Sequence, residues 1–387
     1  MKRIGTSERP FWQEQAESFG FKFHTIDGER YWDESAYYQF SLSQIEDDIE
    51  SPTKEIHDMC FDIVSMAVAD EEILKKLHIP ETFWEQIRYS WLQGHPHLYG
   101  RMDFSYSGTG PAKLLELNYD TPTSLFESAF FQYVWLSSMI ESGRLPAHAD
   151  QYNSIQERLT QAFAQIPSLP MPLYFASVKD SHEDYGTVEY MRDIAHSTGI
   201  YTKMIAIEDI GYDSERKLFV DLDGENIPSL FKLYPWEHIF EDEFGKYVPS
   251  SSTLFIEPTW KSVISNKGIL PLLWEKFKGH PNLLETYIDT NPSKPLKSGW
   301  VRKPFFSREG ANVEIKISED INIKVDGPYT DAPFILQEFS PLPKFGNNYT
   351  LIGSWVVGDA PCGIGIREDD SLITKDSSRF LPHIILD

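Results

Sequence analysis

The amino-acid sequence predicts a mixed fold of the α+β and α/β classes, built from more than one lobe. Short alternating runs of apolar and polar residues flank turn clusters, which is typical of antiparallel hairpins, and the clearest spans residues 98–124. Residues 171–210 read instead as strand, helix and strand, the order of a unit with parallel strands. With 387 residues, 41% of them hydrophobic and 14% aromatic, the chain can bury substantial cores, and we expect two or three lobes.

The predicted hairpin at residues 98–124 carries polar side chains at alternating positions of both strands. Because side chains alternate between the two faces of a strand, one face would carry Arg101, Asp103 and Ser105 from the first strand and Glu116, Asn118 and Asp120 from the second. Folding brings Asp103 opposite Glu116 and Asn118, and such a set of oxygen ligands suits Mg²⁺. A solvated polar face is the simpler alternative, but it must explain the whole alternating pattern. We therefore favour a site.

The segments on either side of this hairpin are expected to form helices. Apolar residues between Ile56 and Ala67 recur at helical spacing, so we expect a helix whose buried face includes Cys60 as a small hydrophobic residue. Another helix begins near Thr82, just after a proline. Residues 125–140 are apolar and aromatic, which predicts a buried helix behind the polar face of the hairpin.

Acidic residues lie between the first strand and the helix of the predicted parallel unit. This is a common ligand position in α/β sheets, but polar residues there also cap helices. We expect Asp180 to cap the helix, and we retain Glu183 and Asp184 as candidates for binding a cationic substrate.

The second half of the chain offers cations and small residues that suit a nucleotide. Lys303 lies inside a predicted strand, where burial is costly without a partner, and a triphosphate would supply one. Gln337 is near the end of an apolar strand that can present backbone groups to an adenine edge. Arg367 follows a strand with two glycines, which often mark the close approach of a ligand, and its guanidinium can hold a carboxylate or a phosphoryl group. Each of these residues has a simpler alternative. Lys303 could be a solvated lysine on an edge strand, the apolar strand with Gln337 could be ordinary core packing, and Arg367 could be an exposed turn arginine.

Composition excludes several classes of protein. The formal net charge of −24 argues against nucleic acid and anionic membranes as partners, whereas it attracts cationic substrates. The sequence lacks an apolar run of roughly 20 residues and a secretory leader, and its two cysteines form no disulfide or zinc pattern, so we expect a cytoplasmic protein.

Six segments, in this order, resemble the ATP-grasp synthetase domain of the glutathionylspermidine synthase family, most closely its stand-alone acid–amine ligases without the amidase domain. They are RMD (101–103), LELNYDTPTS (115–124), YPWE (234–237), NKGILPLLWE (266–275), RKPFFSREGANV (302–313) and GIREDDSLIT (365–374). The resemblance implies an ATP-grasp fold with a small preceding α/β lobe. It also implies an ATP- and Mg²⁺-dependent ligase that joins a peptide-like acid to an amine or polyamine through an acyl phosphate.

The resemblance implies roles for individual residues. Asp103, Glu116 and Asn118 would bind Mg²⁺, Arg101 and Arg367 would act on the transferring phosphoryl group, and the loop 307–312 would form a lid. Around ATP the implied residues are Arg101, Met102, Asp103, Lys267, Lys303, Glu309, Gly310, Gln337, Leu372, Ile373 and Thr374. Our candidates for contacting the substrates are Asp120, Thr121, Thr123, Glu183 and Asp184. The bifunctional members of the family carry threonines where this chain has Leu233 and His238, positions that shape the peptide and polyamine pocket.

We divide the chain into three regions: 1–150 with the polar hairpin, 151–255 as the small α/β lobe, and 256–387 as the nucleotide-binding region. An inactive ATP-binding protein of the same fold is the main alternative function. A two-carboxylate hydrolase using Asp103 and Glu116 is a third, although it leaves the lysines and glycines of the second half without a purpose. The sequence leaves the oligomeric state open.

Overall fold

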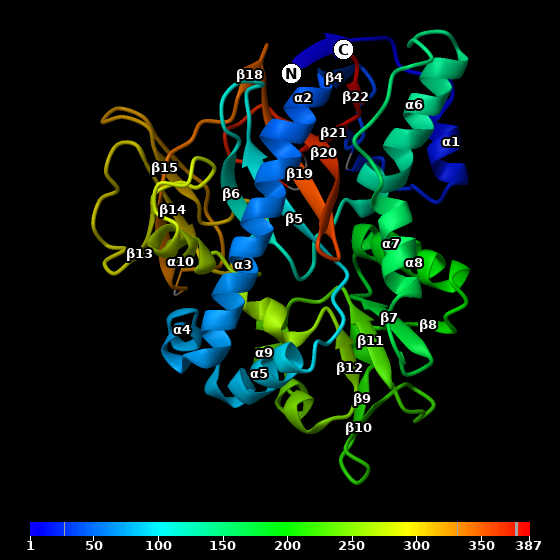
Figure 1. Ribbon diagram of the computed structural model, residues 1–387, viewed down its shortest axis with the longest axis vertical. Coiled ribbons are helices and arrows are strands. Elements are labelled where there is room, and N and C mark those ends of the chain that lie inside the picture. The colour runs from blue at the N-terminus through cyan, green and yellow to red at the C-terminus, as the bar shows by residue number, and fades with distance from the viewer. Residues whose placement is uncertain (27, 331, 376–377) are drawn as a thin grey trace.

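The computed structural model describes residues 1–26, 28–330, 332–375 and 378–387. Figure 1 shows the two ends of the chain side by side, because the first and last strands belong to one small sheet. In that sheet β4 (Ala36–Phe40) lies between β1 (Lys2–Gly5), which is antiparallel to it, and β22 (His383–Ile385), which is parallel. The short antiparallel strands β2 (Thr25–Ile26) and β3 (Glu29–Arg30) lie between β1 and β4 in the chain.

The central sheet is antiparallel and combines strands from the two ends of the chain. Its order is β21 (Arg379–Leu381), β20 (Ala360–Asp369), β19 (Asn348–Val357), β5 (Tyr99–Ser105) and β6 (Lys113–Asn118), with β18 (Lys344–Phe345) also paired to β19. The predicted hairpin at 98–124 is therefore present as β5 and β6. Because β19 pairs with β5, this sheet joins the regions 1–150 and 256–387.

A second antiparallel sheet lies at the left of Figure 1. Its order is β13 (Thr286–Asp289), β17 (Phe334–Glu338), β14 (Trp300–Pro304), β15 (Glu314–Lys316) and β16 (Asn322–Lys324). Helix α10 (Ile269–Lys276) precedes it and packs against β13. Lys303 thus lies in β14 and Gln337 in the adjacent β17.

A parallel sheet with its helices lies at the lower right of Figure 1. Its strands are all parallel, in the order β12 (Leu254–Ile256), β11 (Ser229–Lys232), β7 (Leu173–Ser177) and β8 (Thr202–Ala206). Helix α8 (His182–Ser197) connects β7 to β8, as the strand–helix–strand pattern predicts. The other elements in this part of the chain are two helices, a hairpin and three 3₁₀ turns. They are α7 (Ile155–Ala164), α9 (Trp236–Glu241), the hairpin of β9 (Gly211–Asp213) and β10 (Leu218–Val220), and the turns Ile207–Asp209, Gly245–Ser250 and Thr259–Val263.

Helices cover the central sheet. The predicted helix around Cys60 is α3 (Ser51–Ala69), which packs against α10 and β20, and Cys60 is fully buried. The predicted helix near Thr82 consists of a 3₁₀ turn, Glu81–Phe83, followed by α5 (Trp84–Leu92). The segment after the hairpin forms a π-helical turn, Glu127–Phe131, and then α6 (Gln132–Glu141). The remaining helical segments are α1 (Trp12–Ser18), α2 (Leu42–Ile45), a π-helical turn at Glu46–Glu50 and α4 (Glu71–Lys76).

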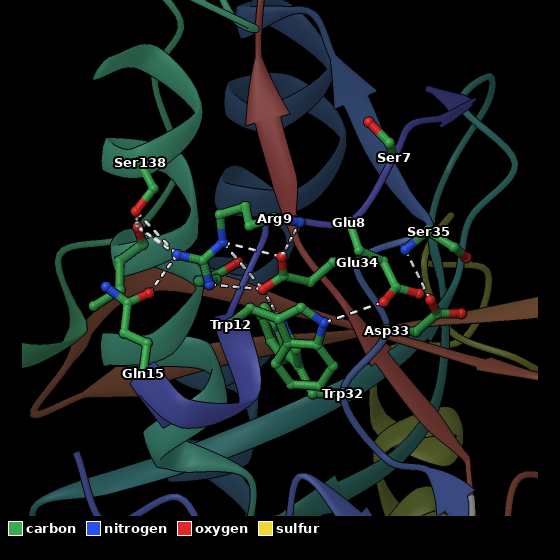
Figure 2. A network of polar contacts seen from close by, with 12 residues as sticks. Ser7, Glu8, Arg9, Trp12, Gln15, Trp32, Asp33, Glu34, Ser35 and Ser138 are labelled. Atoms are coloured by element: carbon green, nitrogen blue, oxygen red, sulfur yellow. Dashed lines mark hydrogen bonds and ion pairs between the residues drawn. The ribbon is translucent and has the colours of Figure 1, made fainter. Parts of the chain in front are cut away.

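A buried ion pair attaches the N-terminal segment to α6 (Figure 2). Arg9 Nη2 lies 2.7 Å from Glu34 Oε1, and the Glu34 side chain is fully buried. Arg9 also donates to Ser138 of α6 and to Gln15, while the indole of Trp32 donates to Glu34. Because each charged group is hydrogen-bonded, these contacts offset the desolvation cost of the buried pair and connect the N-terminal segment to α6. Within the described ranges, none of the helices combines the length and the apolar character that crossing a bilayer requires.

Candidate active site

The polar face of the hairpin is formed by β5 and β6. Asp103 pairs with Glu116 and Arg101 pairs with Asn118, so the four side chains lie on neighbouring positions of two strands. Asn118 Nδ2 donates to Asp103 Oδ2 at 3.1 Å. The set contains two carboxylates and an amide oxygen, which are the kinds of ligand that Mg²⁺ takes in proteins. No cluster of three or more His, Cys, Asp or Glu side chains in the described chain is arranged for a metal ion.

Arg101 is oriented by Asp103 and by the loop after β6. Its Nε and Nη2 donate to the two Asp103 oxygens at 2.6 and 3.1 Å, and its Nη1 donates to the Thr123 carbonyl at 2.9 Å. Burial lowers the pKa of the guanidinium, but the charge of Asp103 outweighs this, so the pKa is raised overall. Gly353 of β19 makes this position possible, because a Cβ atom there would lie 2.7 Å from Arg101 Cδ.

Two lysines from the second half of the chain reach the same hairpin. Lys303 Nζ donates to Gln337 Oε1 at 2.8 Å and to the Leu115 carbonyl at 3.0 Å. Lys267 Nζ lies 3.3 Å from Glu116 Oε2. The carboxylate face and the lysine-bearing sheet therefore meet.

The pKa values of Lys303 and Glu116 are both lowered, but for different reasons. Burial lowers the pKa of Lys303 to about 8. Burial by itself would raise the pKa of Glu116, but Lys267 and Lys303 overcome it and hold the pKa at about 2. Glu116 is therefore ionised at neutral pH beside two cations, and a phosphate chain is the kind of ligand that such a set of cations favours.

Two adjoining cavities lie between the sheets. The first, of about 100 Å³, is lined by Lys267, Lys303, Glu309, Gly310, Gln337, Leu372, Ile373 and Thr374 among others. Gly310 has φ of 71°, and a Cβ atom there would lie 2.4 Å from Ile373 Cγ2, so the loop 307–312 packs closely on residues 372–374 only because it has this glycine. We name this the nucleotide cavity. Two of the residues predicted around ATP line neither this cavity nor the one that adjoins it: the Met102 side chain is fully buried in the core, and Asp103 is 1% exposed.

The second cavity, of about 320 Å³, adjoins the first through shared walls that include Glu116 and Lys267. We name it the reaction cavity. The predicted residues that line it and not the first cavity are Arg101, Asn118, Thr121, Thr123, Asp184 and Arg367. Arg367 Nη2 donates to the Lys375 carbonyl, and its Nε has no hydrogen-bond partner within the described residues.

Arg308 and Glu237 also line the reaction cavity, and the sequence analysis assigned no role to either. Arg308 Nη2 donates to Glu237 Oε1 at 2.6 Å, and its Nη1 donates to Thr121 Oγ1 at 3.1 Å. The loop 307–312 is thereby tied to α9 and to the segment after β6. Both residues lie in the conspicuous segments SREGAN and YPWE, but no local pattern shows that these segments meet.

Asp120 is placed differently from the prediction. Strand β6 ends at Asn118, so the alternation of faces does not continue to Asp120. Asp120 is 2% exposed and lines neither cavity. Its Oδ1 accepts from Lys232 Nζ at 2.5 Å and its Oδ2 from the Trp236 amide at 2.8 Å. The carboxylate thus anchors the start of α9 instead of facing the cavity.

Of the acidic residues at the start of α8, Asp184 lines the reaction cavity, whereas Asp180 and Glu183 are placed differently from the prediction. Ser181, and not Asp180, caps the helix, because its hydroxyl accepts from the Asp184 amide at 3.1 Å. Burial and the charge of Glu183 raise the pKa of Asp184 to about 6. Glu183 does not line either cavity, and it accepts a hydrogen bond from the Tyr31 hydroxyl at 3.1 Å.

The fold and the cleft define the class of the protein: a mixed α/β protein with an oxygen-rich hairpin facing a lysine-bearing sheet. Its fold is similar to that of a glutathione synthetase-like effector from Globodera pallida, with a TM-score of 0.58, 11% sequence identity and 98% of each chain covered. Residues 3–386 match the family model described as glutathionylspermidine synthase preATP-grasp. The chain belongs to the glutathionylspermidine synthase family, as its six segments predict.

Relatives of known name agree with this membership. A protein of Haemophilus influenzae named "Putative acid--amine ligase" is 38% identical over 396 residues, and the match covers 99% of each chain. Trypanothione synthetase of Crithidia fasciculata is 29% identical over 354 residues, which cover 84% of this chain and 53% of that protein. The expected class of enzyme is thus confirmed, since these relatives carry the names of a ligase and a synthetase.

Proposed function

We propose that the protein is an ATP- and Mg²⁺-dependent acid–amine ligase that forms an amide bond through an acyl phosphate. The observation that carries this proposal is the meeting of two halves of the chain in one cleft. Lys267 lies 3.3 Å from Glu116, and Lys303 reaches the backbone of Leu115 next to it. In the proposed ATP-grasp arrangement, residues 1–150 supply the metal ligands, 151–255 form the preceding lobe and 256–387 hold the nucleotide.

The reaction has two steps. The substrate carboxylate attacks the γ-phosphorus of ATP, the bond to ADP breaks, and an acyl phosphate forms. The amine nitrogen then attacks the carbonyl carbon, phosphate leaves, and the nitrogen gives up a proton. Mg²⁺ held by Asp103, Glu116 and Asn118 would neutralise phosphate charge. Arg101, Lys303 and Arg367 would stabilise charge that develops on the phosphoryl oxygens.

The reaction cavity has separate surroundings for the two substrates. Arg101 offers a cation for the carboxylate, while Asp184, supported by Glu183, offers negative charge for an ammonium. Thr121 and Thr123 line the space between, and the loop 307–312 would keep water from the acyl phosphate. The family and the named relatives support a peptide-like acid and an amine or polyamine as substrate classes.

The proposal is tested by measuring ADP release from purified protein with ATP, Mg²⁺ and a panel of acids and amines. Release that requires both an acid and an amine, and that stops on removal of Mg²⁺ with EDTA, is expected. Lys303→Met should lower the rate at least about 100-fold, whereas Lys324→Met, an exposed change in β16, should not. Tight ATP binding without turnover would instead establish the inactive nucleotide-binding protein, and activity without nucleotide would establish a hydrolase.

A further inference from the structure

A third cavity, of about 450 Å³, continues the cleft beyond the reaction cavity. Glu237, His238, Ser265 and Phe306 line both. The third cavity shares no described lining residue with the nucleotide cavity. The three spaces therefore form a row, with the reaction cavity in the middle. We name the third one the distal cavity.

The walls of the distal cavity are mainly apolar and aromatic. They include Ile79, Phe240, Phe306, Tyr329 and Pro333. The carboxylates and imidazoles on these walls are those of Glu237, Glu241, His78 and His238, and no lysine or arginine lines the cavity in the described chain. An anionic group would lose its hydration here and face Glu241 and Glu237, and the guanidinium of Arg308 is already paired with Glu237. An apolar group would gain roughly 25 cal/mol per Å² buried.

Contacts with neighbouring elements hold the walls of the distal cavity in place. Phe240 of α9 packs on Phe83 with ring centroids 4.3 Å apart, so α9 contacts the 3₁₀ turn that precedes α5. The Tyr329 amide donates to Asn312 Oδ1 at 2.8 Å, which ties this wall to the loop 307–312. The ion pair between Arg308 and Glu237 lies where the two cavities meet, since Glu237 lines both.

Two guanidinium groups mark the path from the metal face to the distal cavity, although the carboxylates of Glu116, Asp184 and Glu309 also line the reaction cavity. Arg101 lies at its start, and Arg308, bonded to Thr121 and Glu237, lies near its end. Guanidinium groups attract carboxylate and carbonyl oxygens and repel an ammonium. The acid substrate therefore fits this path better than the amine does.

Resting on the proposed function, we propose that the distal cavity binds the far end of the acid substrate, and that this acid is extended, with an apolar far end free of negative charge. The activated carboxylate lies at Arg101, and the opposite end of the same molecule lies between Phe240, Phe306 and Tyr329. Glu241, which is exposed on α9 at the edge of the cavity, contributes to the rejection of anionic ends.

Calorimetric titration with acetyl-Phe-Gly-Gly, acetyl-Glu-Gly-Gly and acetyl-Gly tests the proposal by binding. The phenylalanine peptide should bind at least tenfold more tightly than the glutamate peptide. Glu241→Lys should reduce this ratio at least threefold. Glu243→Lys is the matched control, because it changes the net charge equally from an exposed position that does not line the distal cavity. Ala332→Trp, which fills the cavity, should weaken the phenylalanine peptide and leave acetyl-Gly unchanged.

Each other outcome overturns the proposal: equal affinities, no binding of either long peptide, or the same response to both charge changes. The test is independent of turnover. If the peptides bind in the expected order but no ADP is released with any amine, the proposed ligase function fails while the preference of the distal cavity stands.

Discussion

Replacing Glu127 by glutamine tests a buried carboxyl group behind the candidate active site. Glu127 is 1% exposed, and both of its side-chain oxygens lack a hydrogen bond to any part of the chain that the structure describes. Burial and the charge of Glu183 raise its pKa to about 8, although the charge of Arg367 acts in the opposite direction. The folded protein therefore keeps this proton at neutral pH.

The raised pKa makes folding less favourable as the pH increases. The unfolded chain releases the proton near the ordinary value of 4.5, whereas the folded chain keeps it up to about 8. Below that range both states are protonated, and the group adds no pH dependence to the free energy of unfolding. Within it the free energy of unfolding falls by about 1.4 kcal/mol per pH unit, which amounts to a loss of about 5 kcal/mol above pH 8.

Glutamine cannot ionise, so Glu127→Gln should remove this pH dependence. Relative to the unchanged protein, the variant's free energy of unfolding should rise by about 4 kcal/mol between pH 5 and pH 8. Urea unfolding followed by tryptophan fluorescence measures this difference at each pH. Glu141→Gln, an exposed change at the end of α6, is the control and should give a constant difference. A constant difference for Glu127→Gln as well would refute the reasoning, because it would mean that the carboxyl group is ionised in the folded protein.

Three further outcomes are expected. Lys232→Met leaves the buried Asp120 carboxylate without its cation, so denaturation should show a loss of about 3–5 kcal/mol; a loss below 1 kcal/mol would contradict the ion pair. The imidazoles of His57 and His97 hold the pKa of Asp359 well below its ordinary range, so Asp359→Asn should destabilise the protein by about 1 kcal/mol at pH 7. That difference should shrink as the pH falls below about 4, where the unfolded carboxyl is protonated, and urea unfolding at both pH values decides it. Removal of Mg²⁺ should weaken ATP binding in calorimetry, and an unchanged affinity would exclude the proposed metal ligands.

Local patterns were sufficient to predict the elements that carry most of the candidate site. Alternating side chains around a turn cluster predict β5 and β6, because both the strands and the turn are encoded within one short segment. Strand, helix and strand in sequence likewise predict the parallel lobe. The same reasoning fails at Asp120, because the strand ends two residues earlier and the chain then turns toward Lys232.

Long-range partners could not be predicted from such patterns. The pairing of β5 with β19 depends on which of many apolar strands meets the hairpin, and nothing in either segment identifies the other. Glu127 lies in an apolar run that predicts core packing, and its acidic side chain was overlooked there. The contact between Arg308 and Glu237 joins two loops whose approach depends on the packing of the whole lobe.

The place of β5 in the central sheet has a consequence for protein synthesis. β5 ends at Ser105, but its neighbour β19 begins only at Asn348, so the ribosome releases one edge of the hairpin long before the strand that covers it exists. Unpaired edges recruit strands from other molecules. Nascent chains therefore need shielding for most of translation, and a product that stops before Asn348 will aggregate instead of retaining half of the cleft.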